Sequence, residues 1–155
     1  MENATKIKVA LVAFFAALDS LLGWRGVMAL VWVGAMLLDY ISGTAAAIQS
    51  KEWSSCTARQ GLWHKGGMIM VVLVAAIGDL ILATVFESMS LGIAWPAALF
   101  PLVLAWYIIT ELGSILENAT KMGAPVPSWL TSVLAAGRKA VESAGDAALK
   151  GLDKE

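Results

Sequence analysis

The sequence has 155 residues, of which 59% are hydrophobic and only 15% are charged. Its mean hydropathy of +0.74 excludes a water-soluble single domain, because a chain of this length cannot bury so much apolar surface. Eleven basic and twelve acidic residues give a net charge of −1. The sequence therefore has no excess of positive charge with which to bind a nucleic acid. The lone cysteine, Cys56, excludes an intramolecular disulfide.

Apolar segments occupy most of the chain in the order 6–22, 27–48, 66–86 and 96–116. A helix needs about 18 or more apolar residues to cross the hydrocarbon layer, and the first segment is short for that. We therefore expect an all-α integral membrane protein with three to four transmembrane helices. The sequence GWRG at 23–26 predicts a break, and Pro96 suits the first turn of the last span.

These segments form one predicted membrane domain over residues 6–117, preceded by a tail of residues 1–5 and interrupted by a polar loop at 49–65. Residues 118–155 are predicted to be a cytoplasmic tail. Two prolines in MGAPVPSW end the preceding helix, and Ser128 can cap a further helix at about 128–150. This C-terminal helix is amphipathic and can equally lie on the membrane surface. Its apolar face contains Leu130, Val133, Leu134, Gly137, Val141 and Ala144.

The distribution of basic residues predicts the topology. If residues 6–22 cross the membrane, ten of the eleven Lys and Arg residues lie on one side and only Arg25 lies opposite. Such a bias is typical of a cytoplasmic face, so we expect a multi-pass protein with both termini in the cytoplasm. The alternative is a signal peptide, since two lysines precede the first apolar run, but no small-x-small cleavage site follows it.

Each apolar segment contains one acidic residue: Asp19, Asp39, Asp79 and Glu111. A charge in mid-membrane costs about 3 kcal/mol or more, so such residues turn inward, pair or become neutral. Apart from Lys6 and Lys8 at the very start of the first segment, no Lys or Arg lies inside these segments, and we therefore expect neutral carboxyl groups. Helical rise from the flanking lysines places the acids of the last three segments in one layer.

Small residues lie one helical turn from two of these acids. Ala35 and Gly43 flank Asp39, and Ala75 and Ala83 flank Asp79. Small side chains let helix backbones approach closely, so these positions predict helix-contact faces. Two roles remain open: packing within one subunit, or contacts between subunits and the lining of a pore.

Enzymatic chemistry is not indicated. Cys56 and His64 share a loop but lack an orienting partner, and they supply too few ligands for a metal site. We expect no catalytic, cofactor-binding or metal-binding residue. Tryptophans near the segment ends suit anchoring at the membrane interface, namely Trp24, Trp53, Trp63, Trp95 and Trp129.

Three stretches resemble the bacteriophage holins of the group that includes toxin-secretion holins. DYISG at residues 39–43 is similar to the family's Asp-Tyr-Ile-Thr-Gly signature, and SSCTARQGLWHK at 54–65 resembles its Ser-Ser loop. ELGSILENATKMGAPVPSWL at 111–130 is similar to the family's Glu-x-x-Ser-Ile-Leu-Glu-Asn element and the Gly-x-Pro-x-Pro that follows. Besides Asp39, Gly43 and Glu111, the matching positions are Tyr40, Ser54, Ser55, Gly61, Ser114, Glu117, Asn118, Gly123 and Pro127.

The resemblance implies a small protein of the bacterial inner membrane that oligomerises with itself in the lipid bilayer and permeabilises it at a set time. An endolysin then reaches the cell wall, without a direct contact to the holin being necessary, and the host cell lyses. It also implies that no residue is catalytic. Two other classes remain: a small ion- or proton-conducting channel or transporter subunit, and a scaffold that binds a partner through residues 128–150.

Overall fold

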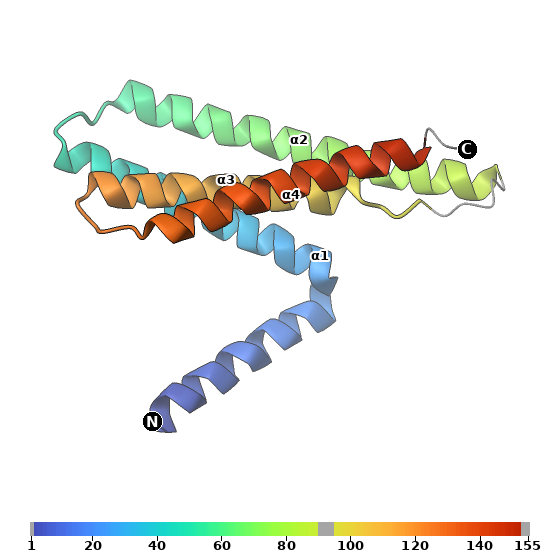
Figure 1. Ribbon diagram of the computed structural model, residues 1–155, viewed down its shortest axis with the longest axis horizontal. Coiled ribbons are helices and arrows are strands. Elements are labelled where there is room, and N and C mark those ends of the chain that lie inside the picture. Colours follow the sequence, from blue (N-terminus) through green and yellow to red (C-terminus); the bar gives the residue numbers. More distant parts are fainter. Residues whose placement is uncertain (1, 90–94, 153–155) are drawn as a thin grey trace.

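The computed structural model consists of four helices, α1 (Glu2–Gln49), α2 (Ser55–Ser88), α3 (Leu99–Lys121) and α4 (Ser128–Leu152) (Figure 1). It describes the backbone of residues 2–89 and 95–152, and the side chains there apart from those of residues 2–4, 10, 11, 14, 15, 18, 19, 149, 151 and 152. Three segments are long and apolar enough to cross a membrane: Ser20–Gln49, Ser55–Ser88 and Leu99–Lys121. The predicted all-α membrane fold is confirmed.

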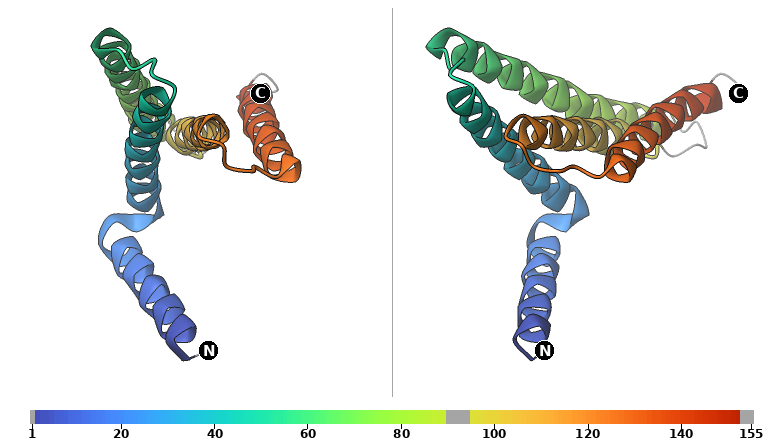
Figure 2. Two further views of the ribbon diagram at one scale, coloured as in Figure 1. Left: turned by 90° about the vertical axis from the view of Figure 1, so that its left-hand side faces the viewer. Right: turned by 60° about the vertical axis from the view of Figure 1, so that its left-hand side comes forward.

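Helix α1 is broken at Gly23, where φ is +67° and ψ is 164°. Glycine takes this backbone conformation without a steric penalty, which explains why the break falls here. The residues before Gly23 point away from the other helices, as Figures 1 and 2 show. Whether residues 6–22 cross the membrane remains a prediction, and the side chain of Asp19 lies outside the described residues.

Helix α2 begins at Ser55, whereas the sequence predicted a polar loop as far as residue 65. Ser54 is the N-cap, and its side chain accepts a hydrogen bond from the backbone N–H of Cys56 at 3.2 Å. No proline interrupts the residues that follow, so polar residues of the expected loop become the first turns of the helix. Lys65 is therefore a helical residue inside the bundle.

Helix α3 begins at Leu99, three residues beyond Pro96. Pro101 lies in its first turn, where a missing N–H removes no helical hydrogen bond. At the other end Gly123 takes a φ of +89°, and its N–H donates to the carbonyl of Thr120 at 2.9 Å. This left-handed position explains the signature glycine, because a side chain there is strained.

The bundle core lies where α1, α2 and α3 meet. Leu104 is fully buried at its centre, and Trp32 stacks on Tyr107 with 6.0 Å between the ring centroids. Helix α3 packs against all three other helices, while α2 meets α1 over a short stretch only. Figure 2 shows α4 beside α3, on the side away from α1 and α2. The buried cluster consists of Trp32, Met36, Met68, Val72 and Leu104.

Candidate functional site

A cluster of charged side chains joins the three spanning helices. Lys65 of α2 lies with its Nζ 2.9 Å from Oδ2 of Asp39 in α1 and 2.6 Å from Oε2 of Glu111 in α3. The expectation that these carboxyl groups have no basic partner is wrong, because Lys65 belongs to the helix and not to a loop. The pairing replaces part of the hydration that each charge loses inside the bundle.

Asn118 completes the cluster from α3. Its Nδ2 donates to Oδ1 of Asp39 and to Oγ of Ser42, both at 3.1 Å. A Cβ atom at Gly43 would meet the same Nδ2 at 3.4 Å, so a glycine allows the two backbones to lie this close. The predicted helix-contact face at Asp39 and Gly43 thus faces α3 of the same chain.

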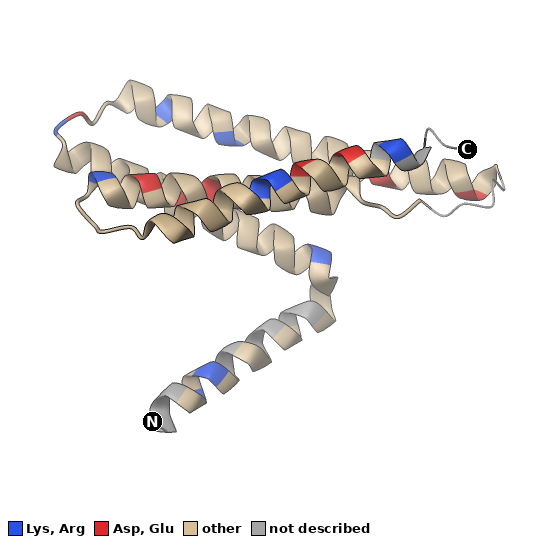
Figure 3. Cartoon of the chain, in the orientation of Figure 1, with Lys and Arg blue, Asp and Glu red and all other residues tan. Residues whose placement is uncertain are grey.

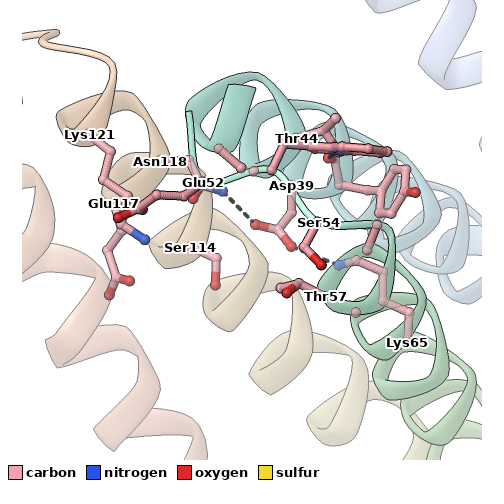
Figure 4. Close-up of a pocket in the computed structure, with 16 residues that line it drawn as sticks. Asp39, Thr44, Glu52, Ser54, Thr57, Lys65, Ser114, Glu117, Asn118 and Lys121 are labelled. Atoms are coloured by element: carbon pink, nitrogen blue, oxygen red, sulfur yellow. Dashed lines mark hydrogen bonds and ion pairs between the residues drawn. The ribbon is translucent and has the colours of Figure 1, made fainter. Parts of the chain in front are cut away.

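A polar cavity of about 360 Å³ opens beside this cluster, at the end of the bundle where α1 ends and α2 begins. Figure 4 shows its side chains, with Lys65 and Asp39 drawn from opposite helices. Glu52, Glu117 and Lys121 add charges to its wall. Many of the signature positions gather here, although they are distant in sequence: Asp39, Tyr40, Gly43, Ser54, Gly61, Ser114, Glu117 and Asn118.

Asp79 lies in a different place from the other two acids. It is 14 positions beyond Lys65 on α2, which corresponds to about 21 Å of helical rise. The prediction that three acids share one layer is therefore wrong for Asp79. The reason is that Lys65, which served as a membrane-edge marker in that estimate, lies at the level of Asp39 and Glu111.

The carboxylate of Asp79 caps the N-terminus of α3. Oδ1 accepts from the backbone N–H of Leu99 at 3.0 Å and from Nε1 of Trp95 at 2.8 Å, and Oδ2 accepts from the N–H of Phe100 at 2.9 Å. Pro101 has no N–H. Every backbone N–H group in the first three residues of α3 therefore has an acceptor. An anion also suits the positive end of the helix dipole.

The remaining predicted positions lie outside the Lys65 cluster. Ala35 and Ala75 are buried inside the chain, whereas Ala83 is half-buried. Ser55 is the exposed first residue of α2, and Gly123 and Pro127 lie in the connection from α3 to α4. A role for any of these positions in assembly or in a pore remains a prediction.

Polar contacts also fix α4 against α3. Trp106 Nε1 donates to Oε1 of Glu142 at 3.0 Å, and the guanidinium of Arg138 lies 4.4 Å from the Trp106 ring centroid. The hydrogen bond from Trp106, and then that from Arg138, lowers the pKa of Glu142 below its usual value. Glu142 is therefore an anion at neutral pH.

Comparison with known proteins identifies the family. The profile of the bacteriophage holin family matches residues 8–138. The chain belongs to this family. The family and the three spanning helices together show a membrane-embedded protein of the holin type.

Its relatives among curated proteins extend over nearly the whole holin chain. An uncharacterized protein of Halalkalibacterium halodurans is 31% identical over 86% of this chain and 93% of its own length. One of Listeria innocua is 30% identical over 83% and 84%, and an uncharacterized 14.9 kDa protein of Clostridium perfringens is 29% identical over 86% and 95%. No solved structure matches the chain.

The role of Lys65 in this holin is the main feature that sequence reasoning missed. Two signals point to it: Ser54 is a good N-cap residue, and no proline follows before the apolar run. Both favour a helix that already includes Lys65. Among the described residues, no group of three or more His, Cys, Asp or Glu side chains is placed to hold a metal ion.

Proposed function

We propose that the protein is a holin that assembles from many copies in the cytoplasmic membrane of a bacterium. The assembly opens the membrane at a set time, and an endolysin crosses it to reach the peptidoglycan. The endolysin passes through the opening, and no direct contact with the holin is necessary. Until the lesion opens, both termini of each copy lie in the cytoplasm.

The observation that carries this proposal is the filled interior of the three-span bundle. Leu104, Trp32 and Met68 close the space between the helices, and the Lys65 ion pairs link the helices at another level. Helices about 10 Å wide that pack in this way leave no passage for a folded enzyme. An opening for a protein therefore requires several copies around a common centre.

Inducible expression together with a cell-wall hydrolase that lacks an export signal tests the proposal. Growth should continue while the holin accumulates and then stop abruptly, since assembly depends on concentration. Lysis should follow when the hydrolase is present, and cells should die intact when it is absent. Release of no folded cytoplasmic protein at any expression level would contradict the proposal.

A second candidate is an ion- or proton-conducting channel. The polar cavity favours it, because charged side chains lead from one end of the bundle to Lys65 and Asp39. A channel needs room only for partly hydrated ions. It should collapse the membrane potential at once and in proportion to dose, while the cell retains its proteins.

A further inference from the structure

The exterior of the subunit is divided into an apolar side and a charged side. Large exposed apolar side chains lie mainly on α1 and α2: Leu37 is 59% exposed, Val74 is 68% exposed and Leu80 is 68% exposed. Between Lys65 and Ser88, α2 contains only Asp79 and Glu87 as charged residues, and Asp79 is buried. The outer surfaces of α1 and α2 are therefore suited to lipid.

Helix α4 has charged residues on its exposed side from Arg138 onward, whereas Trp129 and Val133 are exposed in its first turns. Its half-buried residues recur at one-turn spacing and face α3, so its other side is free of the bundle. Figure 3 shows basic and acidic residues following one another along this helix. The exposed charged residues are Arg138, Lys139, Glu142, Asp146 and Lys150.

The wall of α3 beside α4 contains both polar and apolar side chains. A cavity of about 370 Å³ lies between the two helices, and both contribute hydroxyl or charged side chains to it. The polar lining residues are Thr110, Ser114, Glu117 and Thr120 of α3, and Thr131 and Arg138 of α4. Charge and polarity thus extend across two adjacent helices on one side of the subunit.

This polar side lies at the depth of the membrane. Trp106, which contacts Arg138 and Glu142, is about 10 Å of helical rise from Leu99 and about 22 Å from Lys121. The charged face of α4 at that depth is incompatible with a surround of lipid tails, because each charge there costs about 3 kcal/mol or more.

We propose that α4 packs on α3 in the assembled lesion, as it does in the structure, and that its charged face lines the water-filled opening. The apolar surfaces of α1 and α2 then face lipid. This inference rests on the proposed holin function. It assigns the lumen to Lys139 and Asp146, and not to the acidic residues within the spanning helices.

Thiol labelling of proteoliposomes tests which surface meets water. The parent is the full chain with Cys56→Ser, and entrapped fluorescent dextran reports opening independently of the label. Single cysteines at Lys139 and Asp146 should react with a sulfonated maleimide at least 10-fold faster than matched cysteines at Leu37 and Val74. Equally slow reaction at all four positions would overturn the proposal.

A tether tests whether α4 stays on α3. A Cβ atom at Gly137 would lie 3.4 Å from Cδ1 of Ile109, so Ile109→Cys with Gly137→Cys places two thiols at the contact. Air and copper–phenanthroline oxidise them to a disulfide. Dextran release by the oxidised protein should stay within about twofold of that by the reduced protein. Release that is lost on oxidation and restored on reduction would overturn the placement of α4.

The two experiments distinguish a failure of the α4 placement from a failure of the proposed holin function. A parent that never releases dextran refutes the holin proposal and the inference together. A parent that releases dextran, with a tethered form that does not, refutes the inference alone. If the doubly substituted chain fails to fold, the labelling rates decide by themselves, because they need only single substitutions.

Discussion

Lys65 lies between the carboxyl groups of two other helices, so three ionisable groups share a largely enclosed site. Its side chain is 13% exposed, and those of Asp39 and Glu111 are 20% and 4% exposed. Desolvation of such charges offsets much of their attraction, so the cluster adds little net stability over apolar residues of the same shape. Removing a single member is different, because the remaining charges lose their partner.

Replacing Lys65 with methionine should therefore destabilise the folded monomer by roughly 3 kcal/mol, since two carboxylates are left facing each other. Thermal unfolding in detergent micelles, followed by circular dichroism, measures the change. Lys65→Arg is the matched control and should retain most of the stability. Adding Asp39→Asn and Glu111→Gln to Lys65→Met should recover most of the loss. An unchanged midpoint for Lys65→Met alone would contradict the ion-pair role.

Asp79 stabilises α3 as a cap supplied by another helix. Asp79→Ala should cost about 1–2 kcal/mol, because the N–H groups of Leu99 and Phe100 lose their acceptor. Faster hydrogen exchange at these two amides is the specific signature. Glu87→Ala, an exposed carboxylate on the same helix, should leave both exchange rates unchanged. Equal exchange in both variants would show that the cap is dispensable.

Helices α1 and α3 approach closely near Gly43, because small and polar side chains face each other at that end of their contact. Gly43 lies against Asn118, and Ala46 is buried farther along α1. At this end of the contact an amide-to-carboxylate hydrogen bond, from Asn118 to Asp39, connects the two helices. This contact positions Asp39 for Lys65.

Gly43→Leu should separate α1 from α3 and lower stability by about 1–3 kcal/mol, as overpacking does elsewhere. Gly34→Leu is the matched control on the same helix, because a Cβ atom there meets nothing within 4 Å. Thermal unfolding compares the two variants. Similar midpoints would argue that the approach at Gly43 is loose enough to accept a side chain.

Composition and apolar run length predict the spanning helices, since lipid forces each backbone polar group into an internal hydrogen bond. The same reasoning fails at Lys65, because a basic residue beside an apolar run looks like a membrane-edge anchor. Only the meeting of α2 with α1 and α3 turns it into an ion-pair partner. Likewise, the apolar face of 128–150 predicts an amphipathic helix, but its docking on α3 depends on Trp106, 36 residues away from Glu142.

The two ends of the bundle differ in the number of basic residues near them: Lys51 and Lys121 lie near one end and Arg25 lies near the other. Gln49, Ser55 and Lys121 lie at the end that holds the polar cavity, and Arg25 lies at the other, where its Nη2 donates to the carbonyl of Ala97 at 3.3 Å. If residues 6–22 cross the membrane, they return the N-terminus to the basic end. The positive-inside bias makes this the cytoplasmic end.

Until the lesion opens, reporter fusions should therefore place Met1 and Glu155 both in the cytoplasm, and a fusion truncated after Ser88 should report from the outside. Activity of a phosphatase that works only outside the cytoplasm, compared with fluorescence of a protein that matures only inside, gives the assignment. A periplasmic N-terminus together with a cytoplasmic C-terminus would show that residues 6–22 do not cross the membrane.

The Lys65 cluster has a consequence for biosynthesis. The chain is made from its N-terminus, so α1 and α2 leave the ribosome before α3. The first hairpin can then enter the bilayer with the cation of Lys65 matched to the anion of Asp39. Glu111 and Asn118 arrive later, on the helix that completes the bundle. Insertion can thus proceed from a charge-balanced hairpin to a three-helix unit, with α3 as the last of the three spanning helices to dock.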